Sequence, residues 1–315
     1  MANDKKKKIQ ITGTFTATIE LLDDNDKPTT PPIDPEKPQV GDDSQLLFLS
    51  NFETGFIQPR DANPDGWSEQ NGGVPNATIV QSGITRTGRY AVKHTLDKKN
   101  WDGTSPIQGD IKPRAQLMKA VEFLPYQLGA DMWTGVSVFI PEDWENETNA
   151  NNKVVLWQFH STGADLKNTS PNLVLNVVND QLQIWTRYGD LAAKPLVNIE
   201  LFIEDLESNK GKWVDFVIYT RFANDETGVI QLWKNGLRVV DYAGPCSYTN
   251  SASPGSDNSP LYVTLSLYKP KFVDVPTSQQ RLTVYYDEFR VAEGKDMRAI
   301  VDPASLRKAP KVGGL

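Results

Sequence analysis

Short runs of β-forming residues, separated by turn residues, recur from Leu46 to Val291 and set the fold class of this chain. Within these runs apolar residues alternate with polar ones or form short continuous stretches, and few segments show the 3.6-residue period of a helix. Asn179-Asp180 and Asn235-Gly236 mark tight turns between runs. Many antiparallel strands with little helix predict a β-sandwich or jelly roll. The predicted strands include residues 77–80, 90–96, 134–140, 154–160, 173–178, 181–188, 213–221, 229–233, 261–268 and 281–291.

The N-terminal segment has a different pattern. Residues 9–21 alternate strictly between apolar and polar side chains, with Gly13 at the one gap, which predicts a long half-buried strand. Residues 23–44 are rich in Pro, Asp and Lys, as is typical of an extended linker. A lone amphipathic strand cannot bury its own apolar face, so we expect it to anchor the protein to another chain, with an edge of its own domain as the alternative. The predicted organisation is an anchoring strand over 1–22, a linker over 23–44, a jelly roll over 45–293 and a polar tail with a short helix over 294–315.

Composition excludes several classes of partner. The net charge is −7 at pH 7, which argues against nucleic acid or an anionic membrane, because binding to a phosphate backbone needs a basic face. An acidic polymer is compatible with this charge only where positive side chains gather locally in a groove. Cys246 is the one cysteine, so no intramolecular disulfide can form. No continuous apolar core follows the run Lys5–Lys8, so no signal peptide is recognised.

Strand parity selects the candidate functional residues. Alternate residues of a strand face opposite sides of a sheet, so the apolar residues of each predicted strand define its core side. In residues 154–160, for example, Val155, Trp157 and Phe159 are expected to face the core. On the opposite, open face we expect Arg114, Gln116, Gln158, His160, Trp185, Arg187, Tyr262, Thr264, Ser266 and Tyr268.

This set of side chains fits one chemistry, the cleavage of a uronate polymer by β-elimination. The reaction needs a group such as Arg or Gln to neutralise the C5 carboxylate, so that charge developing at C5 is tolerated. It also needs a base for the C5 proton and an acid for the departing glycosidic oxygen, and His and Tyr are suited to these proton transfers. The paired carboxylates of a retaining glycosidase, spaced as Glu-x-Asp-x-x-Glu, do not occur in the sequence. His94, the other histidine, shares a parity with apolar residues and is expected in the core or an interface.

Three motifs resemble the polysaccharide lyases of the heparin-lyase and alginate-lyase type. Those proteins share a concanavalin-like β-jelly-roll and carry Arg-x-Glu-Leu, Gln-x-His and Tyr-x-Lys-x-Gly-x-Tyr on three strands. Here the corresponding stretches are residues 114–117 (Arg-Ala-Gln-Leu), 158–160 (Gln-Phe-His) and 262–268 (Tyr-Val-Thr-Leu-Ser-Leu-Tyr). The resemblance extends over about 250 residues and includes residues 133–144, 211–216 and 286–291. It implies an all-β jelly-roll sandwich.

The resemblance also implies roles for individual residues. Arg114 and Gln158 would neutralise the carboxylate, His160 would act as the base and Tyr268 as the acid, with Tyr268 as an alternative base. Compared with the family pattern, Gln116, Thr264 and Ser266 stand in place of Glu, Lys and Gly, respectively. These departures remove an orienting partner of Arg114 and a positive charge, and suggest a slow enzyme or a changed substrate. The candidate substrate-binding residues are Gln116, Trp185, Arg187, Thr264 and Lys269.

We therefore expect a lyase or depolymerase of an acidic, uronate-containing polysaccharide. Because no signal peptide is recognised, we expect it on a larger assembly such as a phage particle, attached through the N-terminal strand, and thus on a virion or outside the cell. The alternatives are a non-catalytic carbohydrate-binding decoration or fibre protein of a virion, or a purely structural jelly roll. No cofactor is expected. The acidic segment Asp23–Asp26 does not have the spacing of a Ca²⁺ loop, although a structural Ca²⁺ on the sheets stays open.

Overall fold

The computed structural model describes residues 43–60, 66–101, 112–147, 149, 151–162, 169–193, 195–252 and 260–308. The expected N-terminal strand over residues 9–21 and most of the expected linker lie outside these residues. Among the helices of the described residues, none is long and apolar enough to cross a membrane.

The described chain consists mainly of strands. The strands are β1 (Phe48–Ser50), β2 (Ser68–Gln70), β3 (Thr78–Gln81), β4 (Ala91–Asp97), β5 (Arg114–Lys119), β6 (Met132–Phe139), β7 (Val154–Ser161), β8 (Leu173–Val178), β9 (Gln181–Asp190), β10 (Val197–Asp205), β11 (Trp213–Arg221), β12 (Val229–Lys234), β13 (Leu237–Ala243), β14 (Tyr248–Thr249), β15 (Leu261–Tyr268) and β16 (Arg281–Glu293). The helical elements are η2 (Asp43–Gln45), η3 (Lys98–Asn100), η4 (Leu206–Asn209), α1 (Arg298–Val301) and η6 (Pro303–Lys308).

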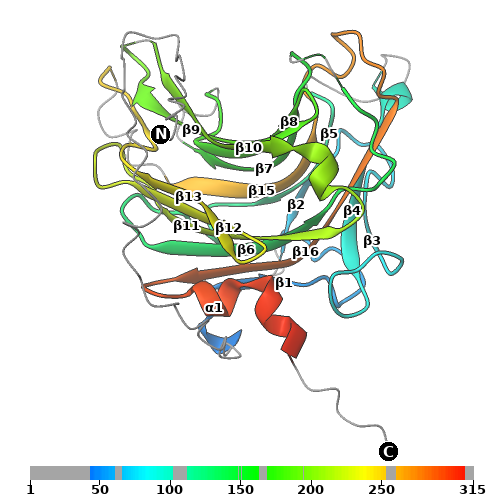
Figure 1. The fold of residues 1–315 in the computed structure, drawn as a ribbon, viewed down its shortest axis with the longest axis horizontal. Coiled ribbons are helices and arrows are strands. Elements are labelled where there is room, and N and C mark those ends of the chain that lie inside the picture. The colour runs from blue at the N-terminus through cyan, green and yellow to red at the C-terminus, as the bar shows by residue number, and fades with distance from the viewer. Residues whose placement is uncertain are drawn as a thin grey trace, which may run out of the picture. The chain divides into compact units, whose positions relative to one another are not determined.

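The strands form two sheets that pack face to face (Figure 1). The sheet that we call the front sheet has the order β10-β9-β8-β7-β15-β5-β2, with β14 beside β9. The back sheet has the order β13-β12-β11-β6-β16-β4-β3, with β1 beside β16. Neighbouring strands run antiparallel except β14, which is parallel to β9. The prediction of an all-β jelly-roll sandwich is confirmed.

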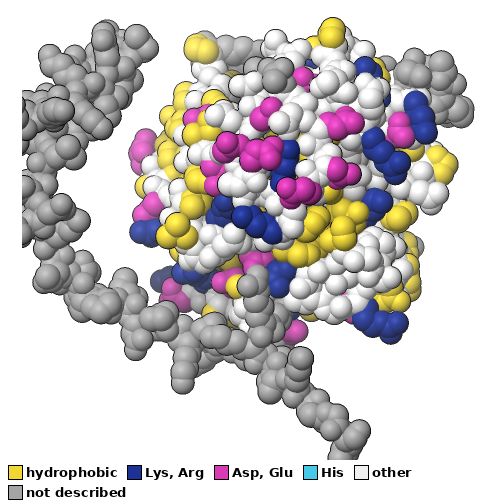
Figure 2. All heavy atoms as spheres, turned by 45° about the vertical axis from the view of Figure 1, so that its right-hand side comes forward, with side chains coloured by type: hydrophobic (Ala, Val, Ile, Leu, Met, Phe, Trp, Pro, Cys, Tyr) yellow, Lys and Arg dark blue, Asp and Glu magenta, His cyan; other side chains and the backbone are white. Residues whose placement is uncertain are grey.

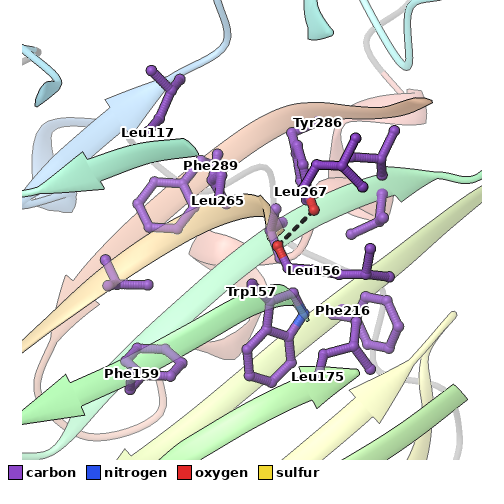
Figure 3. Packing of buried hydrophobic residues seen from close by; sticks show 14 of the residues in the cluster. Leu117, Leu156, Trp157, Phe159, Leu175, Phe216, Leu265, Leu267, Tyr286 and Phe289 are labelled. Carbon is purple, nitrogen blue, oxygen red and sulfur yellow. Dashed lines mark hydrogen bonds between the residues drawn. The ribbon is translucent and has the colours of Figure 1, made fainter. Parts of the chain in front are cut away.

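The core lies between the two sheets and follows from the alternation of apolar residues. Trp157, Leu265 and Leu267 of the front sheet are buried against Phe216 and Phe289 of the back sheet (Figure 3). The rings of Trp157 and Phe216 meet edge to face, with centroids 6.4 Å apart. Each such side chain contributes about 1.5–3 kcal/mol by leaving water, so this layer supplies most of the force that holds the sheets together.

A β-bulge in β7 corrects one parity prediction. The register between β7 and β15 shifts between Leu265 and Tyr268, and the register between β7 and β8 shifts between Val155 and Trp157. An extra residue at a bulge reverses the alternation beyond it. Leu156 therefore joins the core cluster, and Val155, which was expected there, does not.

Tyr286 of β16 connects the two sheets at this bulge. Its ring is fully buried, and its hydroxyl lies 2.6 Å from the carbonyl oxygen of Leu156 and 2.7 Å from that of Ser266 (Figure 3). Both carbonyls belong to the stretch where the ladder between β7 and β15 is interrupted. A buried carbonyl without a donor is costly, and the single O–H of the phenol can satisfy either of the two carbonyls that the bulge releases.

The two predicted turns have the expected backbone. Asn179 and Asp180, between β8 and β9, have φ of 50° and 56°. Asn235 and Gly236, between β12 and β13, have φ of 50° and 85°. Two successive positive φ values identify the tight hairpin turn that Asn, Asp and Gly favour.

The C-terminal segment covers part of the outer face of the back sheet. Val301 packs with Trp133, Trp233 and other apolar residues there, and helix α1 lies beside β6 and β16 (Figure 1). A Cβ atom on Gly135 would stand 1.8 Å from the carbonyl oxygen of Val301. Only glycine permits this close approach of backbone to backbone.

We predict that Tyr286→Phe lowers the free energy of unfolding by about 1–3 kcal/mol, because it leaves a buried carbonyl without its donor. Chemical denaturation in urea measures the change. Tyr285→Phe is the matched control, since Tyr285 is the neighbouring tyrosine of β16 and faces the outside of the back sheet. Equal stability of the two variants would show that the hydroxyl bridge contributes nothing.

Candidate active site

Strand β15 lies in the middle of the front sheet, and β5 and β7 pair with its two sides. Paired residues of antiparallel neighbours point to the same face of a sheet. The register places Tyr268 opposite Arg114, Ser266 opposite Gln116, Thr264 opposite Gln158 and Tyr262 opposite His160. The structure therefore brings the residues of all three motifs onto one face, and the strands of this sheet curve along their length (Figure 1).

Arg114 and Tyr268 are in direct contact. The guanidinium carbon of Arg114 lies 4.4 Å from the centroid of the Tyr268 ring, a distance at which a cation and an aromatic face attract. Arg114 also donates hydrogen bonds to Oε1 of Gln70 (3.1 Å) and to the carbonyl oxygen of Lys112 (3.2 Å). All these partners are neutral groups, so the positive charge of Arg114 is not offset by any carboxylate within the part of the chain that the structure describes.

The three departures from the lyase pattern form one hydrogen-bonded network. The hydroxyls of Thr264 and Ser266 are 2.7 Å apart, and Ser266 donates to Oε1 of Gln116 at 3.1 Å. The amide of Gln116 in turn donates to Oε1 of Gln70 at 3.3 Å. Thr264, Ser266 and Gln116 are all buried. Neutral groups that hydrogen-bond to one another thus occupy the positions where the lyase pattern has Glu and Lys. Gln70, which the sequence analysis does not identify, accepts hydrogen bonds from both Arg114 and Gln116 and orients them.

His160 is held by backbone on both sides of its ring. Nδ1 lies 2.8 Å from the carbonyl oxygen of Ser161, and Nε2 lies 2.9 Å from that of Thr169. Burial lowers the pKa of His160, an effect to which the nearby charge of Arg187 adds and which the two carbonyls oppose. A neutral imidazole carries one N–H, so it can donate to only one of these carbonyls. In this arrangement neither ring nitrogen is free to take a proton from a ligand.

Tyr262 links the two ends of the site and had been given no role from the sequence. Its ring stacks on His160, with centroids 5.4 Å apart and planes at 15°. Burial raises the pKa of Tyr262, Arg114 lowers it and Tyr268 raises it, so these three side chains are close enough to interact electrostatically. The sequence feature that could have identified Tyr262 is its parity with Tyr268 in the same motif. In the register Tyr268 is paired with Arg114 and Tyr262 with His160, so Arg114 and Tyr268 lie toward the C-terminal end of β15 and His160 toward its N-terminal end.

A second cationic group lies on the β9 side of the sheet. Arg187 is 8% exposed and donates to Oδ1 of Asn198 (2.8 Å) and to the carbonyl oxygen of Pro171 (3.1 Å). Burial lowers the pKa of Lys153, and Arg187 and Lys271 lower it further, so both cations lie close enough to Lys153 to interact with it electrostatically. None of the three forms an ion pair within the described ranges. This arrangement favours a negatively charged ligand.

The remaining predicted residues differ in position. Trp185 is half-buried and donates from Nε1 to Oε1 of Gln183 at 3.0 Å, on the face that carries Arg187. Lys269 does not reach the open face, because its ammonium is fully buried and pairs with Glu147 at 3.2 Å. His94 is buried as expected, and burial lowers its pKa to about 3. The described residues contain no group of three or more His, Cys, Asp or Glu side chains that could hold a metal ion.

Comparisons with known proteins bear on the fold and the family of the chain. An endo-β-1,4-glucuronan lyase from the fungus Trichoderma reesei superposes with a TM-score of 0.59 at 19% sequence identity, covering 79% of this chain and 97% of that one. An alginate lyase of polysaccharide lyase family 7 gives 0.46 at 12% identity over 70% and 85% of the two chains, and an alginate lyase from Pseudomonas aeruginosa gives 0.43 at 16% over 72% and 98%. No curated protein sequence matches the chain. Residues 61–290 match the family described as Polysaccharide lyase, and the chain therefore belongs to the polysaccharide lyase family.

Proposed function

We propose that this protein cleaves a uronate-containing polysaccharide by β-elimination on the open face of the front sheet. The observation that carries the proposal is the pair of arginines on that face, Arg114 and Arg187, whose hydrogen-bond partners are all neutral. A buried or half-buried cation without a carboxylate is costly unless a ligand brings the negative charge. A polymer with a carboxylate on each sugar supplies such charges at regular intervals.

Arg114 and Tyr268 form the reacting end of the site in this proposal. Arg114 offsets the substrate carboxylate and the negative charge that develops when C5 loses its proton. The electrons of the C5–H bond form the C4=C5 double bond, the C4–O bond breaks, and the departing oxygen is protonated. Tyr268, in contact with the cation of Arg114, starts as the phenolate, accepts the C5 proton to become the phenol, and passes a proton to the departing oxygen, so that the protein ends in its starting state.

His160 is the other group proposed for the base. Both of its ring nitrogens lie against carbonyl oxygens, so action as a base requires the contact with Thr169 or Ser161 to break first. In the proposal His160 instead holds Tyr262 in place by stacking on its ring. Gln158, which is paired in register with Thr264, donates a hydrogen bond from its side-chain amide to the substrate.

Non-catalytic binding of the same polysaccharide is the second candidate. It is favoured by the neutral network of Gln116, Ser266 and Thr264 and by the occupied nitrogens of His160. Elimination leaves an unsaturated uronate that absorbs near the ultraviolet edge. Absorbance with a panel of uronate polymers therefore separates the two, because binding without a rise in absorbance, from folded protein, supports the second candidate.

We predict that Tyr268→Phe lowers turnover by about 10² or more, the usual effect of losing a positioned acid or base. His160→Asn lowers turnover less, and its effect follows the loss of stability, because the ring serves to support Tyr262. Initial rates and melting temperatures are measured for both variants. A loss of about 10² or more in His160→Asn at unchanged melting temperature would instead assign the base to His160.

We predict that the two arginines affect different parameters. Arg114→Ala lowers kcat and raises KM, because the cation acts on both the bound carboxylate and the charge in the transition state. Arg187→Ala raises KM and leaves kcat nearly unchanged, because Arg187 lies away from Tyr268 across β8 and β7. Steady-state kinetics on one polymer measures both. Equal loss of kcat in the two variants would contradict the division of roles.

The proposal includes attachment to a larger assembly, such as a virion, through residues 9–21. Its basis is the unsatisfied apolar face that the alternating sequence predicts for this segment. Deleting residues 1–44 should keep the melting temperature and remove self-association or attachment, as measured by light scattering. A fall of many degrees in the melting temperature would show that the segment belongs to its own domain.

A further inference from the structure

The outer face of the back sheet carries a row of side chains that the proposed reaction does not use. Successive pairs in the strand register are Ile79 with Lys93, Lys93 with Tyr285, Tyr285 with Phe139, and Phe139 with Trp213. The row thus crosses five neighbouring strands in a straight line. Ring centroids are 5.8 Å apart for Phe139 and Tyr285 and 5.6 Å apart for Phe139 and Trp213. Phe139 and Trp213 are half-buried, so one side of each ring reaches the surface.

A cavity of about 320 Å³ adjoins the Lys93 end of this row. Three cations line it, and Nζ of Lys93 also lies 5.8 Å from the centroid of the Tyr285 ring. Lys99 pairs with Asp97 at 3.3 Å, whereas Lys93 and Arg281 form no ion pair in the described part of the chain. The lining residues are Val74, Pro75, Asn76, Ala77, Ile79, Lys93, Thr95, Asp97, Lys99, Asn100 and Arg281. Figure 2 brings forward the side on which β3 and β4 lie and shows hydrophobic side chains exposed beside Lys and Arg.

We infer that this cavity and the aromatic row form a second, non-catalytic binding site for an acidic polysaccharide. The apolar C–H face of a sugar ring packs on the exposed sides of Phe139 and Trp213, and a carboxylate lies between Lys93 and Arg281. The amides of Asn76 and Asn100 are available in the same cavity for sugar hydroxyls. The identity of the polymer rests on the proposed function, whereas the site itself rests on the residues of the back sheet.

Charge complementarity selects an acidic polymer over a neutral one. The cavity contains three cations and one carboxylate, Asp97, in a protein of net charge −7. Asp143 is a further carboxylate that acts on the row. Burial raises the pKa of Tyr285, Asp143 also raises it, and Arg281 lowers it. A local excess of positive charge on an otherwise acidic protein concentrates a polyanion at that place.

A second site on the opposite face changes how a long polymer behaves. The front sheet binds one stretch of the polysaccharide, and the back sheet binds another stretch of the same polysaccharide molecule. Linking two weak contacts through one flexible polymer makes the second contact intramolecular, which increases the overall affinity without tighter binding at either site. A short oligosaccharide, which cannot reach both sheets, gains nothing from the second site.

The test is affinity electrophoresis in gels containing sodium alginate, with dextran gels as the neutral control. Every protein carries Tyr268→Phe, so that the probe is not cut. The test variant adds Lys93→Gln and Arg281→Gln, and a matched control adds Arg238→Gln and Lys295→Gln, two exposed cations elsewhere. We expect the apparent affinity for alginate to be about five-fold weaker in the test variant, because each exposed charge contact contributes a factor of a few. The apparent affinity of the control should be unchanged. Asp143→Asn should strengthen the retardation.

Retardation that is equal in the test variant and the control overturns the second site. Retardation in dextran equal to that in alginate also overturns it, because the site is argued from charge. These results do not depend on turnover, so a failure of the proposed reaction would appear separately, as a missing absorbance change in the protein with Tyr268 intact. If both hold, Lys93→Gln with Arg281→Gln in that active protein raises KM for long alginate and leaves KM for a trisaccharide unchanged.

Discussion

The hydroxyl of Tyr286 is the contact on which the geometry of the open face depends. It reaches across the sandwich from β16 and lies within hydrogen-bond distance of one carbonyl oxygen of β7 and one of β15, where the ladder between these strands is broken. Without this donor the bulge would bury one more unpaired carbonyl, and a regular ladder would be favoured. A regular ladder would move Val155 into the core and change the neighbours of Tyr268. The position of Tyr268, the tyrosine proposed to react, is thus set from the opposite sheet.

Much of the fold could be predicted from the sequence, and the two longest strands that were missed have a common cause. Strands such as β8 and β11 were recognised because runs of apolar and β-branched residues lie between turn residues. Strands β10 (Val197–Asp205) and β13 (Leu237–Ala243) were not among the predicted runs, and both lie at sheet edges and contain a register shift. A shift reverses the alternation midway, and an edge strand has fewer buried residues, so the periodic signal is weak. The bulge that moved Val155 out of the core has the same origin.

The candidate site shows a similar division. Parity and motif order were sufficient to place Arg114, Gln158, His160 and Tyr268 on one face. The sequence could not show that Gln116, Thr264 and Ser266 bond to one another, because each replacement was considered by itself as a loss. It also could not show the carbonyl of Thr169 at the ring of His160, since that contact depends on the path of the loop after β7. The face of a strand on which a residue lies can be predicted from sequence periodicity, whereas contacts between side chains can be identified only in the three-dimensional structure.

The strand order has a consequence for how the chain folds. Strand β15 lies within the front sheet, between β7 and β5, and β16 lies within the back sheet, between β6 and β4, so the last two strands of the sequence lie inside the two sheets. Strand β1 pairs with β16 across more than two hundred residues of sequence, with Phe48 opposite Val291. Neither sheet can close around these positions until nearly the whole chain has left the ribosome. Such long-range closure makes folding slow, and it makes the open face of the front sheet one of the last features of the molecule to form.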